Sequence, residues 1–387
     1  MALKHISRRD LLRRAAVGVA LTGVVPSVVD GSSHSGVTEN RFDDPDGQLH
    51  ASIQLTSNCN AYGPSERVNA AIRAATRAAH LDPEKEVELA RDRIASQHQV
   101  RRDEVVLAGG SARILRMAVS AFVTPGKTLI TAEPTFEVAS RYAKSMNRDV
   151  VSIPLRPGYS HDLDAMLDRC DSSTGLVYIC NPNNPTGSLT HRRELESFIA
   201  KLPATTRVLI DEAYHHYVDD TSDYRSFIDH PIDDDRVIVT RSFSKIYGLA
   251  PLRIGYAVAS RDVAAMLEAH RTSEGVSAIT VKAAVAALTD GDYVRVSRIR
   301  NADDRQEFFN QANARMVRWI DSQTNFVMLN ADRPAEEVVA HFERNRVLLS
   351  RPYVHFPKYV RVSLGTPAEM HEFWRVWELM PGGGHHH

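Results

Sequence analysis

Short apolar runs of strand length alternate with longer amphipathic stretches through most of the sequence, and this alternation limits the possible folds. The strand-like runs lie at residues 105–108, 128–131, 149–154, 175–180 and 207–210. Helical periodicity covers residues 66–79 and 84–98 and resumes at Gly110 and near Thr190. Because strands separated by helices are usually joined by crossovers, the pattern predicts an α/β fold with a largely parallel sheet between helical layers.

Beyond residue 255 the pattern changes, which indicates a second and smaller domain. Helices are expected near 262–271 and 278–289, and a long polar helix near 292–312. A chain of 387 residues, 43% of them hydrophobic, is long enough for two cores. The predicted parts are an export signal (1–30), an N-terminal arm (31–65), a large domain (66–285), a small domain (286–381) and an appended tail (382–387).

Charge and cysteine content narrow the class of ligand. Basic residues number 47 and acidic residues 48, for a formal net charge of −1, so no global field attracts nucleic acid or an anionic membrane. The three cysteines, Cys59, Cys170 and Cys180, are too scattered to indicate a disulfide framework or a metal site. We therefore expect small-molecule partners and no metal.

The N-terminal residues are typical of a twin-arginine export signal. Arg8 and Arg9 precede an apolar run at 15–25 that ends at Pro26 and is too short to be a stable membrane anchor. Export to the periplasm or outside the cell is therefore expected. No clear Ala-x-Ala cleavage site follows, and a basic N-terminal helix on a cytoplasmic protein is the alternative. The histidines of the tail at 382–387 are excluded from any metal argument.

One polar segment, SFSKIYGLAPLRIG at 242–255, combines a lysine with phosphate-binding residue types. A lysine such as Lys245 captures a carbonyl when apolar surroundings or nearby cations lower its pKa. The hydroxyls of Ser242 and Ser244 and the guanidinium of Arg253 are suitable donors to a phosphate dianion. A segment that can bind both an aldehyde and a phosphate predicts pyridoxal phosphate as the ligand, held by Lys245 as a Schiff base. An exposed lysine in a polar turn is the alternative.

Two other positions have the same chemical character. Backbone amides of Gly110, Ser111, Ala112 and Arg113 lie where a strand becomes a helix, and the helix dipole favours phosphate there, although a simple tight turn also fits. Asp211 ends a strand at the edge where open α/β sheets bind ligands. Capping of a following helix is the competing role for this aspartate.

Seven strings in order resemble the fold type I pyridoxal-phosphate aminotransferases of class I/II, and are most similar to the histidinol-phosphate aminotransferase-like enzymes. They are NCNAYGPS (58–65), GGS (109–111), PTF (134–136), NPNNPTG (181–187), DEAY (211–214), the lysine segment, and YVRVSLGT (359–366). The resemblance covers about residues 50 to 380. It implies a large α/β/α domain with a mostly parallel sheet, a smaller α+β domain, and a homodimer with shared active sites.

The resemblance also implies roles for residues around the cofactor. Asp211 would pair with the pyridine nitrogen, which makes the ring an electron sink. Asn184 and Tyr214 would share the phenolic oxygen, and Phe136 would stack on the pyridine face. Tyr62 would reach the cofactor phosphate of the partner subunit. For Phe136, the competing account is a position in the core. For Tyr62, the competing account is a Gly-Pro turn that caps the helix starting near residue 65.

Substrate residues are implied in the C-terminal part. Asn325 would lie near the substrate, and Arg361 would hold the anionic group of the substrate through a two-pronged bond, unless it is a surface salt-bridge arginine. Arg351 is the second expected substrate arginine, since residues 350–359 could meet another anionic group, and a position in solvent is the alternative. His215 and His216 are unusual for the family, and we expect both at the surface, with a place for one of them in the substrate pocket as the alternative. Arg113 also departs from the family, which usually has an acidic residue there.

The predicted function is transfer of an amino group between an amino acid, or an amino-acid-like amine, and a 2-oxo acid. Lys245, once freed from the cofactor, would act as general base and general acid, with Asp211 and Tyr214 as the other catalytic residues. Decarboxylation, elimination or cyclisation with the same cofactor is the first alternative, because a fold does not fix its reaction. A non-catalytic ligand-binding protein is the least favoured.

Overall fold

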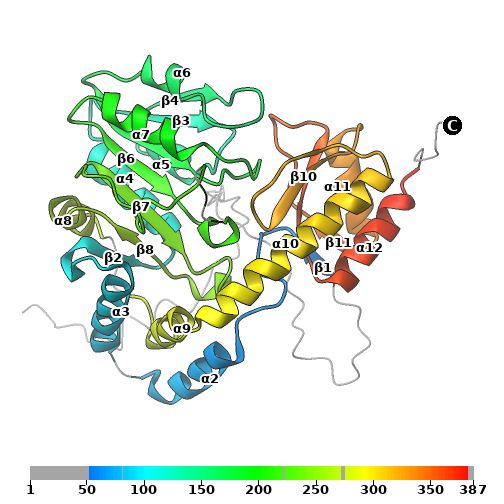
Figure 1. Cartoon of the computed structure of the whole chain (residues 1–387), viewed down its shortest axis with the longest axis horizontal. Helices are drawn as coiled ribbons and strands as arrows, with labels where there is room; N and C mark the ends of the chain where they lie inside the picture. Colours follow the sequence, from blue (N-terminus) through cyan, green and yellow to red (C-terminus); the bar gives the residue numbers. More distant parts are fainter. Residues whose placement is uncertain (1–51, 81, 220, 222, 272–274, 382–387) are drawn as a thin grey trace, which may run out of the picture. The chain divides into compact units, whose positions relative to one another are not determined.

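The computed structural model describes residues 52–80, 82–219, 221, 223–271 and 275–381 (Figure 1). The predicted export signal, most of the N-terminal arm and the tail lie outside the described residues. The strands are β1 (Ile53–Leu55), β2 (Val105–Ala108), β3 (Thr128–Glu133), β4 (Asp149–Pro154), β5 (Thr174–Cys180), β6 (Arg207–Asp211), β7 (Val237–Ser242), β8 (Gly255–Val258), β9 (Trp319–Ile320), β10 (Phe326–Asn330), β11 (Val347–Leu349) and β12 (Tyr359–Ser363). The α-helices are α2 (Glu66–Ala75), α3 (Glu84–His98), α4 (Ser111–Phe122), α5 (Val138–Ser145), α6 (Leu163–Leu167), α7 (Arg192–Lys201), α8 (Arg261–Ala269), α9 (Ala278–Leu288), α10 (Gly291–Ala314), α11 (Ala335–Arg344) and α12 (Pro367–Glu378).

A seven-stranded sheet forms the centre of the larger part, in the order β2-β8-β7-β6-β5-β3-β4. Strands β3 to β7 pair in parallel, and β8 pairs antiparallel with both neighbours, β2 and β7. The predicted α/β fold with a largely parallel sheet is therefore confirmed. The sequence pattern did not indicate β7 or β8, which overlap the two ends of the lysine segment at 242–255.

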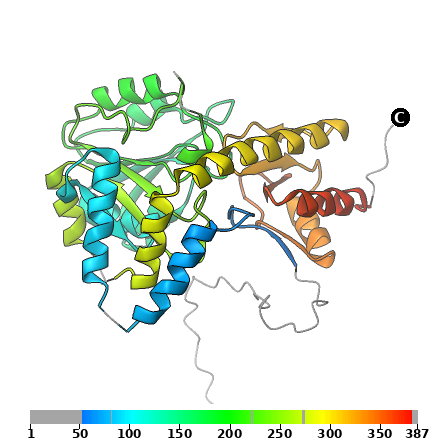
Figure 2. The ribbon, with the colours of Figure 1, turned by 60° about the horizontal axis from the view of Figure 1, so that its bottom comes forward.

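Both faces of this sheet are buried, which explains why its strands are continuously apolar. In β5, Leu176 and Tyr178 contact one core, while Val177 and Ile179 contact the other. Helices α4, α5 and α8 complete the first core, and α2, α3, α7 and α9 complete the second. Figure 2 shows α2, α3 and α9 side by side on their face of the sheet.

The smaller part contains a separate core around the antiparallel sheet β12-β10-β9 and the parallel pair β1-β11. Phe342 of α11 stacks on Phe373 of α12 with ring centroids 4.9 Å apart, and both rings are fully buried. Helix α10 belongs to both parts, since Val294 packs against the core of the larger part and Phe308 lies in that of the smaller part (Figure 1).

Helix ends follow the sequence signals closely. The side chain of Ser65 caps α2 by accepting a hydrogen bond from the amide of Val68 at 3.3 Å. Helix α12 begins with a capping box of Thr366 and Glu369. None of the helices in the described part of the chain is long and apolar enough to span a membrane.

Candidate active site

The predicted cofactor residues gather at one edge of the large sheet, because β2, β3, β5, β6 and β7 all run in the same direction. Each strand ends at this edge and is followed by one of the candidates. In strand order they are Gly110, Phe136, Asn184, Asp211 and Lys245. This is the edge where open α/β sheets bind ligands.

Asp211 is a buried carboxylate, 1% exposed, at the end of β6. Its Oδ1 accepts hydrogen bonds from Thr240 Oγ1 (3.1 Å) and the Ala213 amide (3.2 Å), and Oδ2 accepts one from Tyr178 Oη (3.2 Å). Burial raises the pKa of Asp211 to about 6, although these hydrogen bonds and the charge of Lys245 partly oppose the shift. A protonated pyridine nitrogen beside Asp211 would supply a positive charge, which favours the ionised form of this carboxylate.

Lys245 has the lowered pKa that an amine nucleophile needs. Burial lowers the pKa of Lys245 to about 8, and the cations of Arg361 and Arg253 contribute to the same effect. Its Nζ donates a hydrogen bond to the Ser57 carbonyl at 2.9 Å and lies 5.5 Å from the centre of the Tyr214 ring. Both causes that the sequence suggested, apolar surroundings and nearby cations, are therefore present.

A phosphate cradle forms where the lysine segment meets the start of α4. Ser242 and Ser244 are buried, and Arg253 donates to Ser244 Oγ at 3.2 Å. Gly110 has φ +94°, a backbone conformation that favours glycine, and a Cβ atom there would lie 2.5 Å from Arg253 Nη2 and displace that guanidinium. No side chain caps α4, which leaves the amides of Ser111 and Ala112 for an anion, whereas the Arg113 amide donates to the Gly110 carbonyl at 3.0 Å.

Arg361 connects the small sheet to the cofactor edge of the large sheet. Its Nη1 donates to Asn184 Oδ1 at 2.6 Å, and its Nη2 donates to the Thr56 carbonyl at 2.7 Å. Ser350 Oγ accepts from its Nε at 3.1 Å. With 8% of its surface exposed, Arg361 is not a surface arginine. Because the oxygen of Asn184 faces Arg361, its amide nitrogen is left to donate, which fits the predicted bond to the phenolic oxygen.

Asn58 lies at the centre of the site, and sequence reasoning gave it no role. It has φ +53° and is 1% exposed. Its Nδ2 donates to Tyr214 Oη at 2.9 Å, and its carbonyl accepts from Asn325 Nδ2 at 3.0 Å. Asn58 therefore holds the hydroxyl of Tyr214, one of the two groups expected to bind the phenolic oxygen of the cofactor. No local sequence signal marks Asn58, because its burial and its left-handed backbone conformation appear only in the structure.

Asn325 carries a buried acceptor without a partner. Its Oδ1 makes no hydrogen bond within the described chain, although the residue is only 3% exposed. Orphaned buried acceptors are rare, and they commonly mark a site where a ligand or water binds. This position agrees with the predicted role of Asn325 near the substrate.

Three other predicted residues make contacts of their own. Tyr62 donates to Asp304 Oδ2 of α10 at 3.0 Å, and the Arg300 guanidinium lies 4.2 Å from its ring centre. Phe136 is partly buried against the core that contains α4. Arg351 pairs with Glu137 at 3.1 Å, and its side chain is 71% exposed.

The expectation that His215 and His216 lie at the surface was wrong. The side chain of His215 is 19% exposed, and its Nε2 lies 3.5 Å from Asp229 Oδ2. His216 Nε2 lies 3.1 Å from Tyr247 Oη. Both side chains enter the molecule because they stand on η3 (His215–Tyr217), a single 3₁₀ turn packed against α10, and they line a cavity of about 340 Å³. Among the described residues, no group of three or more His, Cys, Asp or Glu side chains could hold a metal ion.

The comparisons with known proteins agree with this geometry. Residues 51–376 match the family Aminotransferase class I and II. The chain therefore belongs to that family and is a pyridoxal-phosphate-dependent aminotransferase, and the cradle, Asp211 and Lys245 fit the cofactor.

Its relatives identify the type of aminotransferase. The chain is 33% identical to the histidinol-phosphate aminotransferase of Symbiobacterium thermophilum, over 87% of this chain and 92% of the relative. It is also 33% identical to that of Bacillus subtilis, over 84% and 90%. The Sinorhizobium meliloti histidinol-phosphate aminotransferase, solved with pyridoxal-5'-phosphate, superimposes with a TM-score of 0.79 at 26% identity, over 86% of this chain and 90% of that one. The protein is thus histidinol-phosphate aminotransferase-like.

The pKa of Asp211 leads to a prediction for the cofactor-free protein. Because folding raises this pKa from 3.8 to about 6, the stability associated with protonated Asp211 is present at low pH and is lost as the pH rises through about 6. Asp211→Asn has no carboxyl group to titrate and does not lose this stability. The free energy of unfolding of the variant minus that of wild type should therefore be roughly 2–3 kcal/mol larger at pH 8 than at pH 4. Urea denaturation at both pH values measures the difference, and a difference independent of pH would contradict the prediction.

Proposed function

We propose that this aminotransferase acts on a free amino acid whose carboxylate binds Arg361, with Lys245 as the residue that carries the cofactor and moves the proton. The observation that carries the proposal is the buried guanidinium of Arg361, which reaches Asn184 at the cofactor edge. A guanidinium fork at that position can bind the anionic group of a substrate while its amine faces Lys245.

The bound cofactor supplies an aldehyde and an electron sink. Asp211 would hold the pyridine nitrogen, Asn184 and Tyr214 would bind the phenolic oxygen, and Phe136 would stack on the ring. The cradle of Gly110, Ser111, Ala112, Arg113, Ser242, Ser244 and Arg253 would bind the phosphate.

Lys245 has the properties of the proton carrier. With a pKa lowered to about 8, a substantial fraction of Nζ is neutral near pH 7 to 8. Neutral Nζ would accept the proton from the α-carbon of the substrate. It would then donate this proton to the carbon that comes from the cofactor aldehyde. The Ser57 carbonyl, which accepts a hydrogen bond from Nζ at 2.9 Å, would orient the amine between these two events.

Histidinol phosphate is the second candidate substrate, because the relatives reported above carry that name. Its phosphate would suit Arg361 as well as a carboxylate does. Arg351, whose exposed pair with Glu137 is of the kind worth about 1 kcal/mol or less, could exchange that partner for a second anionic group. The free amino acid is preferred here because an exported enzyme would rarely meet an intermediate of a cytoplasmic pathway.

Export itself is part of the proposal. It is supported by Arg8 and Arg9 ahead of a short apolar run. A protein exported after folding can carry a cofactor that was loaded in the cytoplasm.

A homodimer with shared sites is also proposed, on the strength of the family resemblance at Tyr62. In a dimer Tyr62 would contact the phosphate of the partner subunit. Light scattering tests the assembly: the mass of two chains supports it, and the mass of one chain contradicts it.

Changing Lys245 tests whether this residue forms the covalent link to the cofactor. Wild-type protein should be yellow and should keep its cofactor after borohydride reduction. Lys245→Ala should lose that reducible link, because no amine remains at this position, while the cradle can still bind cofactor reversibly. Mass spectrometry after reduction gives the answer, and a cofactor adduct on the variant would refute the role of Lys245.

Changing Arg361 tests the substrate. Histidinol phosphate and aromatic, basic and acidic amino acids should be compared by kcat/KM. We expect a free amino acid to be best, and Arg361→Ala to lower its kcat/KM by about 100-fold or more, because two charge-assisted hydrogen bonds are lost. The exposed Arg318 is the matched control, and Arg318→Ala should leave kcat/KM unchanged. A clear preference for histidinol phosphate would reject the free amino acid in favour of the second candidate.

The export signal has its own test. Conservative replacement of Arg8 and Arg9 by lysine keeps the charge but removes the paired guanidinium groups that the export machinery recognises. The double variant should stay in the cytoplasm while the unchanged protein appears in the exported fraction. Cell fractionation that finds the unchanged protein only in the cytoplasm would overturn the proposal.

A further inference from the structure

His216 and Tyr247 join the two segments that carry Tyr214 and Lys245. The hydroxyl of Tyr247 lies 3.1 Å from Nε2 of His216, and the two rings meet edge to face with centroids 5.1 Å apart. His216 follows Tyr214 by two residues, and Tyr247 follows Lys245 by two residues. The contact therefore links the turn after β6 directly to the loop of Lys245.

Packing contacts hold the rest of the lysine loop, whereas the phenol oxygen of Tyr247 is held by its hydrogen bond to His216. The Tyr247 ring packs on Phe243 with centroids 5.0 Å apart, and it is 4% exposed. On the other side of the loop, Gly248 has φ +70°, and a Cβ atom there would lie 2.5 Å from the backbone of Gly63. The loop thus sits between an aromatic layer and another backbone segment, and the bond to His216 fixes the outer end of the ring.

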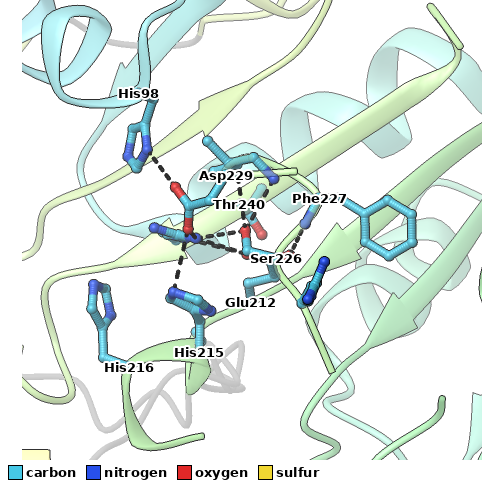
Figure 3. Close-up of polar contacts among 12 residues, drawn as sticks. His98, Glu212, His215, His216, Ser226, Phe227, Asp229 and Thr240 are labelled. Atoms are coloured by element: carbon cyan, nitrogen blue, oxygen red, sulfur yellow. Dashed lines mark hydrogen bonds and ion pairs between the residues drawn. The ribbon is translucent and has the colours of Figure 1, made fainter. Parts of the chain in front are cut away.

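The turn that presents His216 is itself anchored. His215 Nδ1 lies 3.1 Å from Tyr224 Oη, and its Nε2 faces Asp229. Asp229 in turn accepts hydrogen bonds from Arg241 Nη2 at 2.7 Å and lies 3.0 Å from Nδ1 of His98 (Figure 3). The imidazole of His216 is therefore held by a turn tied to a charged network that includes Asp229 and the buried Arg241.

Both partners of the contact are neutral at physiological pH. Burial lowers the pKa of His216 to about 3, with the nearby Arg241 cation as the second cause. Burial also raises the pKa of Tyr247, so the phenol keeps its proton. The hydrogen bond persists across the working pH range and acts as a fixed support.

We propose that His216 is a positioning residue for Lys245, which it holds through Tyr247. By fixing the lysine loop against the turn after Tyr214, the bond sets where Nζ lies, 2.9 Å from the Ser57 carbonyl and 5.5 Å from the Tyr214 ring centre. This inference rests on the role proposed for Lys245. A misplacement of about 1 Å near reacting atoms can cost on the order of 100-fold in rate, so a loosened loop has a measurable effect.

The cavity beside His216 makes a chemical rescue possible. Its volume is about 340 Å³, and it is lined by His215, His216, Val218 and Gly291 among others. Replacing His216 by alanine adds the space of the ring to this cavity. Free imidazole can then enter and bond to the Tyr247 hydroxyl in place of the missing side chain.

The test uses the holoenzyme and three variants. In His216→Ala, kcat should fall about 10- to 100-fold with a smaller change in KM. The pH titration of the visible absorbance of the bound cofactor should also shift, because Nζ has moved. Added imidazole should restore much of both. Tyr247→Phe should reproduce the defect without responding to imidazole, and the double variant should be no worse than either single variant.

A matched control separates this role from a general effect of the cavity. Arg295 lines the same cavity but pairs with Asp292, so Arg295→Ala should leave kcat and the titration unchanged. If His216→Ala folds poorly, His216→Gln keeps a hydrogen-bonding group and should retain the wild-type titration.

An unchanged titration and kcat in His216→Ala, or a defect that imidazole does not restore, would overturn the inference. If Lys245→Ala also keeps its reducible cofactor link, the proposed function itself fails; if Lys245→Ala loses that link, only the positioning role of His216 is rejected.

Discussion

The burial of Asp211 is the interaction on which the rest of the site depends. A carboxylate enclosed at the end of β6 is unfavourable in its charged form, and three hydrogen bonds only partly compensate for the lost water. The packed sheet imposes this position, because both faces of β6 are covered by helices. A cationic ring nitrogen beside Asp211 would relieve this cost, so the site suits a cofactor that can carry a proton there. The lowered pKa of Lys245 arises from the same enclosure.

The parts of the fold that could be predicted from sequence are those with strong local patterns. Strands β2 to β6 have continuous apolar runs, and their helices have clear periodicity, so the α/β layering followed from short-range information. Strand β8 and strand β1 are only four and three residues long, and their place depends on partners far away in the chain. The pairing of Ile53 with Val347 in β1 and β11, for example, has no local signal.

The site could be predicted to a similar degree, and for a similar reason. Lys245, Asp211 and the glycine turn at Gly110 lie within short strings whose chemistry is recognisable in isolation. Asn58 could not be assigned, because its importance comes from Tyr214 and Asn325, which are remote in sequence. The two histidines after Tyr214 were expected at the surface because the family rarely has histidines there. Only the packing of η3 against α10 shows that both are enclosed.

The bond between Arg361 and Asn184 has a thermodynamic consequence. Arg361 belongs to the small sheet and Asn184 to the edge of the large one, so the groups that would hold the substrate anion and the cofactor oxygen share one hydrogen-bond system. Linkage requires that such coupling be mutual. Whatever free energy the bound cofactor adds to the binding of an anion at Arg361, the anion must add to the binding of the cofactor. An occupied substrate site would then help to retain the cofactor, and loss of the cofactor would be fastest when no substrate is present.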